Sequence, residues 1–392
     1  MKQGAKYLIV VAVIFFCVIV FSRITADQVV NLPVQTNDSS IIILFAGDVM
    51  QHEPQILSAW DDSLKTYSYD SCFSFVAPLI KECDIAMANF EFTLGGPPYT
   101  GYPQFSAPDQ IVHALTNAGF DILATANNHS CDRGKKGIER TIRILDSMGF
   151  KHIGTYTDEA SRAQTYPMII KKNGIKLALL NYTYGTNGIA VPSPTVVNLI
   201  NEDQIKTDLS RAKDSMPDKT IVFIHWGNEY ESKPNQYQEY YAKLCFDLGA
   251  DIVIGMHPHV IQKLERKFYP DSNGREVFIA YSLGNYISNQ RTRYRDGGMM
   301  VKMELVKRHN KVSIADCGYY LTWVYIPEKN GKKKYHILPV SQYENMGDVL
   351  DTASFQKMSL YLSDSRKLMQ QMTKNVDEYL FNVDTRVWSN RP

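Results

Sequence analysis

The sequence predicts an α/β protein with a largely parallel sheet. Short apolar runs rich in β-branched residues, such as 41–46 and 220–224, are typical of buried strands. Segments with a helical spacing of apolar residues, such as 108–119, lie between several of these runs. Strands that alternate with helices form largely parallel sheets, and open α/β sheets bind ligands at the edge where their strands end.

The expected elements follow in chain order. The expected strands cover residues 41–46, 85–88, 120–123, 220–224, 251–254 and 277–280. The expected helices cover 108–119, the segment around 138–148, 201–215 and 237–248, with glycines at 119 and 249 as stop signals. An Asn-Gly turn at 173–174 predicts a hairpin between 168–170 and 175–180, followed by a loop at 185–194.

The part of the chain after residue 298 is less regular. It contains strand-like segments at 300–305 and 312–317, and residues 355–381 have a mostly helical pattern. This part is either an accessory layer on the domain or a docking helix for a partner, and the sequence leaves both open.

The expected strands end in side chains that bind metals or transfer protons. These residues are Asp48, Glu91, Asn128 with His129, His225, and His257 with His259. Each of them alone is explained as a turn or cap residue, but unrelated turns have no reason to carry only metal-competent groups. Because parallel strands end along a common edge, we expect these side chains to converge on one rim.

The mixture of ligands narrows the choice of metal. Structural zinc sites favour cysteine or a closed set of four ligands. Carboxylate, amide and imidazole groups suit manganese, iron or zinc, and the residues are numerous enough for two divalent ions. Two ions about 3.5–4 Å apart can activate a water and neutralise phosphoryl oxygens.

Composition and charge exclude some function classes. The 392 residues carry a formal net charge of +1, so no global field attracts nucleic acid, and no nucleic-acid partner is expected. Beyond the first 26 residues the chain has cysteines at 72, 83, 131, 245 and 317. Their odd number forbids complete pairing, and the fold need not depend on disulfides.

The amino terminus predicts export to the cell envelope. Lys2 and Lys6 precede an uninterrupted apolar run at 7–21, which is typical of a signal-anchor over residues 1–26. The alternative is a signal peptide cleaved after Ala26. Residues 27–40 are polar and are expected to be a linker. We therefore expect an extracytoplasmic protein anchored in the bacterial cytoplasmic membrane, with the basic flank inside.

Three arginines form a candidate substrate-binding element. Arg291, Arg293 and Arg295 alternate with other residues, so in an extended segment their guanidinium groups share one face. Arginine forks suit carboxylate or phosphate, and three together suit a repeating polyanion. The alternative is a solvated hairpin face.

Six motifs, taken in order, resemble those of the CapA family of capsule synthesis proteins, also described as poly-γ-glutamate biosynthesis proteins. They are Gly47-Asp48-x-Met50, Asn89-x-Glu91, Asn127-Asn128-His129-x-x-Asp132-x-Gly134, His225-Trp226-Gly227-x-Glu229-Tyr230, Gly255-x-His257-Pro258-His259-Val260 and Tyr281-Ser282-Leu283-Gly284-Asn285. The resemblance covers about residues 41–286. It implies a calcineurin-like metallophosphoesterase fold over 41–300, a β-sandwich flanked by helices (α-β-β-α), with a C-terminal extension of accessory strands and a helix over 301–392.

The resemblance also implies roles for single residues. His129 corresponds to the general acid that protonates the leaving group. The implied metal ligands are Asp48, Glu91, Asn128, His225, His257 and His259, with Glu91 in place of a bridging aspartate. Met50 departs from the pattern, because phosphoesterases carry a histidine there and methionine is a poor ligand for a hard ion. His52 is the candidate replacement.

Two functions are compatible with the sequence. The first is a membrane-anchored, metal-dependent hydrolase of the cell envelope, acting on an anionic capsular polymer or a phosphate-containing precursor. The second is a non-catalytic, metal-containing subunit of a polymer synthesis and export complex that holds an anionic polymer. The expected partners are the polymer or its precursor, the membrane through the N-terminal segment, and polymer synthase or export subunits.

Overall fold

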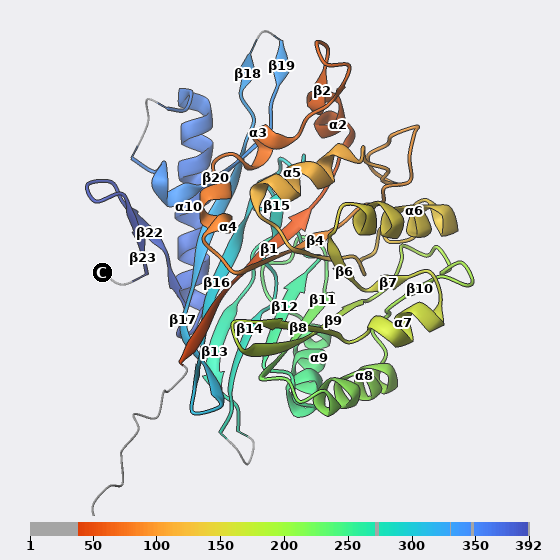
Figure 1. Ribbon diagram of the computed structural model, residues 1–392. Coiled ribbons are helices and arrows are strands. Elements are labelled where there is room, and N and C mark those ends of the chain that lie inside the picture. The colour runs from red at the N-terminus through yellow and green to blue at the C-terminus, as the bar shows by residue number, and fades with distance from the viewer. Residues whose placement is uncertain (1–37, 271–273, 330, 346–348, 391–392) are drawn as a thin grey trace, which may run out of the picture. The chain divides into compact units, whose positions relative to one another are not determined.

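The computed structural model describes residues 38–270, 274–329, 331–345 and 349–390 (Figure 1). Residues from Ser39 onward form one compact unit. Within the described ranges, no helix has both the length and the apolar character needed to cross a bilayer. The signal-anchor predicted for 1–26 lies outside these ranges. Residues 27–37 of the predicted linker also lie outside the described ranges. The last two residues of that linker, 39 and 40, belong to the first strand.

The first sheet is mixed and has nine strands. Their bounds are β1 Ser39–Val49, β4 Ile85–Phe90, β5 Ile122–Ala124, β6 Lys151–Ile153, β15 Asn285–Ile287, β16 Gly297–Arg308, β17 Lys311–Tyr325, β20 His336–Pro339 and β21 Asp377–Glu378. The order is β20-β17-β16-β1-β4-β5-β6, with β15 beside β1 and β21 beside β17. Strands β1, β4, β5 and β6 are parallel, whereas β16, β17 and β20 add antiparallel pairs.

The second sheet has six strands. Their bounds are β8 Met168–Lys172, β9 Ile175–Thr183, β11 Lys219–His225, β12 Ile252–Met256, β13 Leu264–Phe268 and β14 Glu276–Ala280. Strands β9, β11, β12 and β14 are parallel, and β8 and β13 are antiparallel strands at the two edges. The expected strands are confirmed, but they are divided between two sheets rather than joined in one.

Alternation along the strands builds the core. Ile41, Ile43 and Phe45 of β1 point to one face and pack with alternate residues of β9, β11 and β12. The rings of Phe45 and Phe223 meet at 5.7 Å between the two sheets. The intervening residues of the same strands face the helices. The two sheets are therefore buried on both faces in this part of the molecule, which explains the near-continuous apolar runs.

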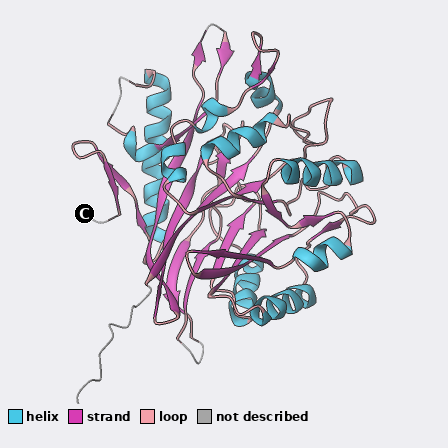
Figure 2. Ribbon diagram, in the orientation of Figure 1, coloured by secondary structure: helices cyan, strands magenta, loops and turns pink. Residues whose placement is uncertain are grey.

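Helices cover the outer faces of both sheets (Figure 2). Their bounds on the first sheet are α3 Asp70–Phe73, α4 Ala77–Lys81, α5 Gln110–Ala118 and α6 Gly134–Ser147, and on the second sheet α8 Glu202–Asp214 and α9 Gln236–Asp247. The layering confirms the predicted α-β-β-α order. A further helix, α10 at Thr352–Met372, packs with the inner-face residues of β16 and β17.

The remaining described elements are short. They are α2 Glu53–Ala59, α7 Glu159–Thr165, the 3₁₀ turn η1 Val340–Gln342, and the strand pairs β2 Trp60–Asp61 with β3 Thr66–Tyr67, β7 Thr155–Tyr156 with β10 Val196–Val197, β18 Glu328–Lys329 with β19 Lys332–Lys333, and β22 Leu380–Asn382 with β23 Val387–Ser389.

The C-terminal part is integrated into the fold. The boundary predicted at residue 300 falls inside β16, which pairs with β1 over most of its length. The helix predicted for 355–381 is wrong beyond Met372. Asn375 adopts a positive φ of 58°, and the following residues pair with β17 as strand β21. Tertiary pairing has overridden the helical pattern there.

Candidate metal centre

The predicted ligands meet where the parallel strands of both sheets end. Asp48 lies near the end of β1, and Glu91 and Asn128 follow β4 and β5 of the same sheet. His225 ends β11, and the turn after β12 carries His257 and His259. All six side chains are at most 3 % exposed. The alternation of strands and helices predicted that the candidate ligands share one rim of a sheet. In the structure, each sheet has such a rim, and the packing of the two sheets brings the rims together.

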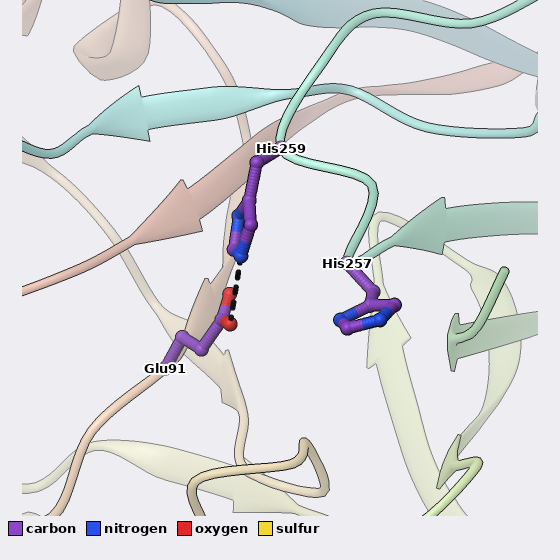
Figure 3. A group of neighbouring side chains, drawn as sticks. All are labelled: Glu91, His257 and His259. Carbon is purple, nitrogen blue, oxygen red and sulfur yellow. Dashed lines mark ion pairs between the residues drawn. The ribbon is translucent and has the colours of Figure 1, made fainter. Parts of the chain in front are cut away.

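Glu91 is shared by two groups of ligand atoms. One group is Glu91 with His257 and His259, and the other is Glu91 with Asp48 and His225; within each group the ligand atoms lie within 4.8 Å of one another. Glu91 Oε1 is 3.6 Å from His259 Nε2 and 3.7 Å from His225 Nε2. Figure 3 shows His259 reaching Glu91 and His257 facing the same space. Glu91 is therefore common to both groups of candidate ligands.

Two further contacts connect the sheets across the centre. Asp48 Oδ2 lies 3.0 Å from His259 Nδ1. Asn128 Oδ1 lies 3.0 Å from His225 Nε2. The amide of Asn128 also donates to Asn187 Oδ1 at 3.3 Å, which orients its oxygen toward the histidine. Each contact joins a residue of the first sheet to a histidine of the second.

Asn89 is a functional residue that sequence reasoning missed. Its Nδ2 donates to Asp48 Oδ1 at 2.8 Å and to Glu91 Oε2 at 3.1 Å, and lies 3.4 Å from His225 Nδ1. It therefore holds both carboxylates and one imidazole. Its place near the end of β4, two residues before Glu91, was the available signal.

Burial sets the electrostatics of this centre. Burial, and next to it the neighbouring Asp48 carboxylate, raises the pKa of Glu91 well above its usual range. Burial, followed by repulsion from neighbouring histidines, lowers the pKa values of His225 and His257 well below theirs. Without a cation the carboxylate is destabilised as an anion, and the imidazoles are neutral, the form that coordinates metals.

The donor set fits divalent ions. Glu91 Oε1 and His257 Nδ1 are buried and have no hydrogen-bond partner in the described part of the chain. A buried polar atom without a partner costs about 1–3 kcal/mol, which a coordinated ion would offset. Carboxylate, amide and imidazole donors together suit manganese, iron or zinc.

His129 lies beside the ligands and is held by its own neighbours. Its Nδ1 is 2.7 Å from Asp132 Oδ2, which also accepts the Phe105 N–H at 2.7 Å. The His129 N–H donates to Asn127 Oδ1 at 3.0 Å, and the Phe105 ring packs edge-on at 4.6 Å. Asp132 stands in the motif quoted above, three residues after His129, but its role was not predicted.

A cleft of about 410 Å³ opens next to these residues. Its lining includes Asn128, His129, Asp132, Tyr102, Asn187 and Glu229. Glu229 and Tyr102 are exposed, whereas His129 is only 3 % exposed. The cleft therefore gives a substrate access to the edge of the centre at which His129 lies.

The loops that carry the histidines of the second sheet are strained. His257, His259 and Tyr230 adopt φ values of +100°, +58° and +68°. A non-glycine residue at positive φ costs of the order of 1–3 kcal/mol and persists only where its surroundings hold it. The Tyr230 N–H donates to Pro258 O at 2.8 Å and so joins the two loops. Such strain is concentrated at functional sites.

His52 and Met50 lie outside both ligand groups. Met50 is buried in the apolar core. His52 begins α2, and its Nδ1 accepts the Asn289 N–H at 3.3 Å and lies 3.2 Å from Gln55 Oε1. Burial lowers the pKa of His52 to about 4, with smaller effects from His259 and His129. His52 is thus a neutral neighbour of the centre, and its role as an additional ligand stays a prediction.

The expectation that three arginines share one face is wrong. The segment is a turn with Tyr294 at φ +75°, not an extended strand. Arg291 lies over Trp323 and donates to Val324 O, and Arg293 pairs with Asp364. Arg295 instead lies over the ring of Tyr230, whose centroid is 6.2 Å from that of the His259 ring. Their substrate-binding role stays a prediction.

The fold and the candidate centre together define the class of protein. It is an α/β sandwich with buried carboxylate, amide and imidazole groups at the strand ends of both sheets. The particular family follows from the sequence. Residues 42–290 match the family described as bacterial capsule synthesis protein PGA_cap, and the chain belongs to that family.

Two relatives and one solved structure are among the proteins to which the chain is similar. The chain is 28% identical over 314 residues to the capsule biosynthesis protein CapA of Bacillus anthracis, covering 76% of this chain and 72% of that protein. It is 28% identical over 360 residues to the PGA biosynthesis protein CapA of Bacillus subtilis, covering 88% and 82%. Among solved structures, the calcineurin-like phosphoesterase YfkN from Bacillus subtilis is similar at a TM-score of 0.42 and 13% identity, over 84% of this chain and 97% of that one.

Proposed function

We propose that this protein is a metal-dependent hydrolase of capsule or poly-γ-glutamate-type polymer synthesis. Its substrate is the anionic polymer or a phosphate-containing precursor. The observation that carries the proposal is Glu91, shared by two buried ligand triplets beside a His129–Asp132 pair that lines an open cleft.

The first part of the proposal concerns the ions. Glu91 would be a ligand in both groups, together with His257 and His259 in one and with Asp48 and His225 in the other. Asn128 joins the second group through its oxygen, 3.0 Å from His225. Two divalent ions of manganese, iron or zinc in such a site lower the pKa of a water and neutralise charge on substrate oxygens.

The second part concerns proton transfer by His129. The Asp132 carboxylate accepts a hydrogen bond from Nδ1–H of His129. Nε2 is therefore the nitrogen that can exchange a proton with a group in the cleft. The backbone N–H of Phe105 and the amide of Asn127 fix Asp132 and the His129 main chain, which limits rotation of the imidazole. In this proposal His129 protonates the leaving atom when the substrate bond breaks.

The third part concerns location. We propose that residues 1–26 anchor the protein in the cytoplasmic membrane with its bulk outside. Lys2 and Lys6 before an apolar run support this orientation, because basic flanks stay cytoplasmic. Membrane fractionation tests it: a soluble mature form that begins near Asp27 would rule out the anchor but not the export.

A second candidate is a non-catalytic subunit that uses the same centre to hold an anionic polymer. Met50 favours it, because this buried thioether occupies the place of an expected histidine ligand. One experiment separates the two candidates. Full-length, metal-loaded protein is incubated with poly-γ-glutamate and with bis-p-nitrophenyl phosphate, beside a His129→Ala variant. Turnover of either compound that disappears in the variant supports the hydrolase; no turnover by fully metal-loaded protein supports the binding subunit.

A further inference from the structure

Arg295 is set apart from the two arginines before it by its surroundings. Arg293 is paired with Asp364, and Arg291 donates to a backbone oxygen while lying over Trp323. Arg295 makes no ion pair with any carboxylate in the described ranges and is half-buried. A partly exposed guanidinium without a carboxylate partner is available to bind an anionic ligand.

The main chain of Arg295 is hydrogen-bonded to Asn285 of β15, a strand that pairs with β1, which carries Asp48. The buried Asn285 of β15 pairs in register with Asp48 of β1. The Asn285 side chain donates to the Arg295 carbonyl at 2.8 Å and to Gln290 Oε1 at 3.0 Å. These two bonds hold the turn 290–295 against the end of β1, so Arg295 begins at the rim of the centre.

The side chain of Arg295 is attached to the opposite half of the centre. Its guanidinium lies 4.0 Å from the centroid of the Tyr230 ring. Tyr230 donates its backbone N–H to Pro258 O, and its ring lies 6.2 Å from that of His259. Arg295 is therefore connected to the β1 side through its main chain and to the His257–His259 turn through Tyr230.

The Arg295 guanidinium forms a hydrogen bond with the Tyr230 side chain, and it has further N–H donors that this bond does not use. A guanidinium that lies over an aromatic ring keeps its N–H groups in a plane and leaves their edge open. That edge matches the two oxygens of a carboxylate or the oxygens of a phosphate. Glu229 interacts with the same Tyr230 side chain but is exposed and lines the cleft. Through Tyr230, the Arg295 guanidinium is thus linked to an acid that lines the cleft.

We propose that Arg295 is a specificity-determining residue that binds an oxyanion group of the substrate, a carboxylate or a phosphate, at the rim of the metal centre. Arg291 and Arg293 serve the packing of the C-terminal region instead. This inference rests on the proposal that the substrate binds at this centre, whether or not it is then cleaved.

The test measures binding in a background that cannot turn over. Full-length, metal-loaded His129→Ala protein is titrated with a poly-γ-glutamate oligomer, which offers only carboxylates, and with tripolyphosphate, which offers only phosphates, at low ionic strength. Arg295→Gln should weaken binding of the cognate probe by about tenfold to hundredfold, as expected for the loss of hydrogen bonds to a charged group. Arg295→Lys should recover part of the loss, because it restores the charge but not the fork.

A matched control removes the same charge elsewhere. Arg143 is exposed on α6, and Arg143→Gln should change binding less than twofold. The probe that responds to Arg295→Gln identifies the chemical group. Equal binding by the parent and Arg295→Gln for both probes, or no binding of either probe by the parent, would overturn the inference. Because turnover is not measured, failure of the hydrolase proposal leaves this result intact.

Discussion

The two sheets contribute different chemistry to one centre. The first sheet supplies carboxylate and amide oxygens from Asp48, Glu91 and Asn128, whereas the second supplies the imidazoles of His225, His257 and His259. Neither sheet carries a complete ligand set, so the centre exists only when the sheets are packed. An ion bound there cross-links the sandwich, and metal binding should stabilise the whole fold.

The two halves also differ in their electrostatics. In the first half, burial and the proximity of Asp48 raise the pKa of Glu91. In the second half, burial lowers the pKa values of His225 and His257. Both shifts disfavour the charged form of the side chain in the absence of a cation. A divalent ion stabilises both the carboxylate anion of the first half and the neutral imidazoles of the second half.

The largest effect is expected where the two halves share a ligand. Glu91→Gln should lower metal affinity by more than about 100-fold, the upper end of what loss of an outer partner costs. It should also raise the free energy of unfolding of the metal-free protein, since it removes a carboxyl group whose ionised form is destabilised by burial beside Asp48. Metal analysis and chelator-treated thermal unfolding measure both. Full metal content in the variant would show that Glu91 is not a shared ligand.

The next prediction distinguishes the roles of two adjacent residues, Asn128 and His129. His129→Ala should leave metal content unchanged and reduce turnover by about 10²–10⁴-fold, the range of general acid catalysis. Asn128→Ala should instead lower metal content, because its oxygen is directed at His225. Parallel metal analysis and rate measurements test this division of labour. If the two variants retain the same amount of metal, the assignment is wrong.

A smaller effect tests the residue that holds the two halves in place. Asn89→Ala removes the donor to Asp48 and Glu91 and the contact with His225. Metal affinity should fall by about 10–100-fold, as for other outer-shell partners. Asn117 serves as a control, since its side chain donates to Asp70 on the exposed surface, and Asn117→Ala should leave affinity unchanged. Equal affinities in both variants would reduce Asn89 to a packing role.

The smallest effect concerns the support of His129. Asp132→Asn keeps the size of the side chain and an oxygen for the Phe105 N–H, but removes the negative charge beside Nδ1. Turnover should fall by about tenfold, less than for loss of His129 itself, with metal content intact. A loss of metal instead would indicate that Asp132 supports the ligands rather than the acid.

Much of this arrangement could be predicted from local pattern. The apolar runs predicted the strands, and the polar residues that follow these runs predicted the candidate ligands. Both predictions were possible because the end of a strand is a local feature of the sequence. The division into two sheets depends on pairing between distant segments, which periodicity does not contain. The same limit explains why β16, which pairs with β1, was assigned to an accessory region.

Side-chain direction was harder to predict than residue type. The arginines at 291, 293 and 295 were recognised as a group, but the turn at Tyr294 sends them to different partners. Asn89 was quoted within a motif, yet its bonds to two carboxylates depend on how β1 and β4 lie side by side. In both cases the contact is tertiary, and the local sequence does not specify it.

Metal content of the purified full-length protein tests the central claim most directly. It is measured by mass spectrometry, together with thermal unfolding with and without chelator. The account predicts about two ions of manganese, iron or zinc per chain. Free metal at a hundredfold excess over its Kd should add about 2.7 kcal/mol to the stability of the fold for each independent site, and His257→Ala should lose the gain from the site to which it contributes. A metal-free protein whose unfolding temperature does not change when these metals are added would contradict it.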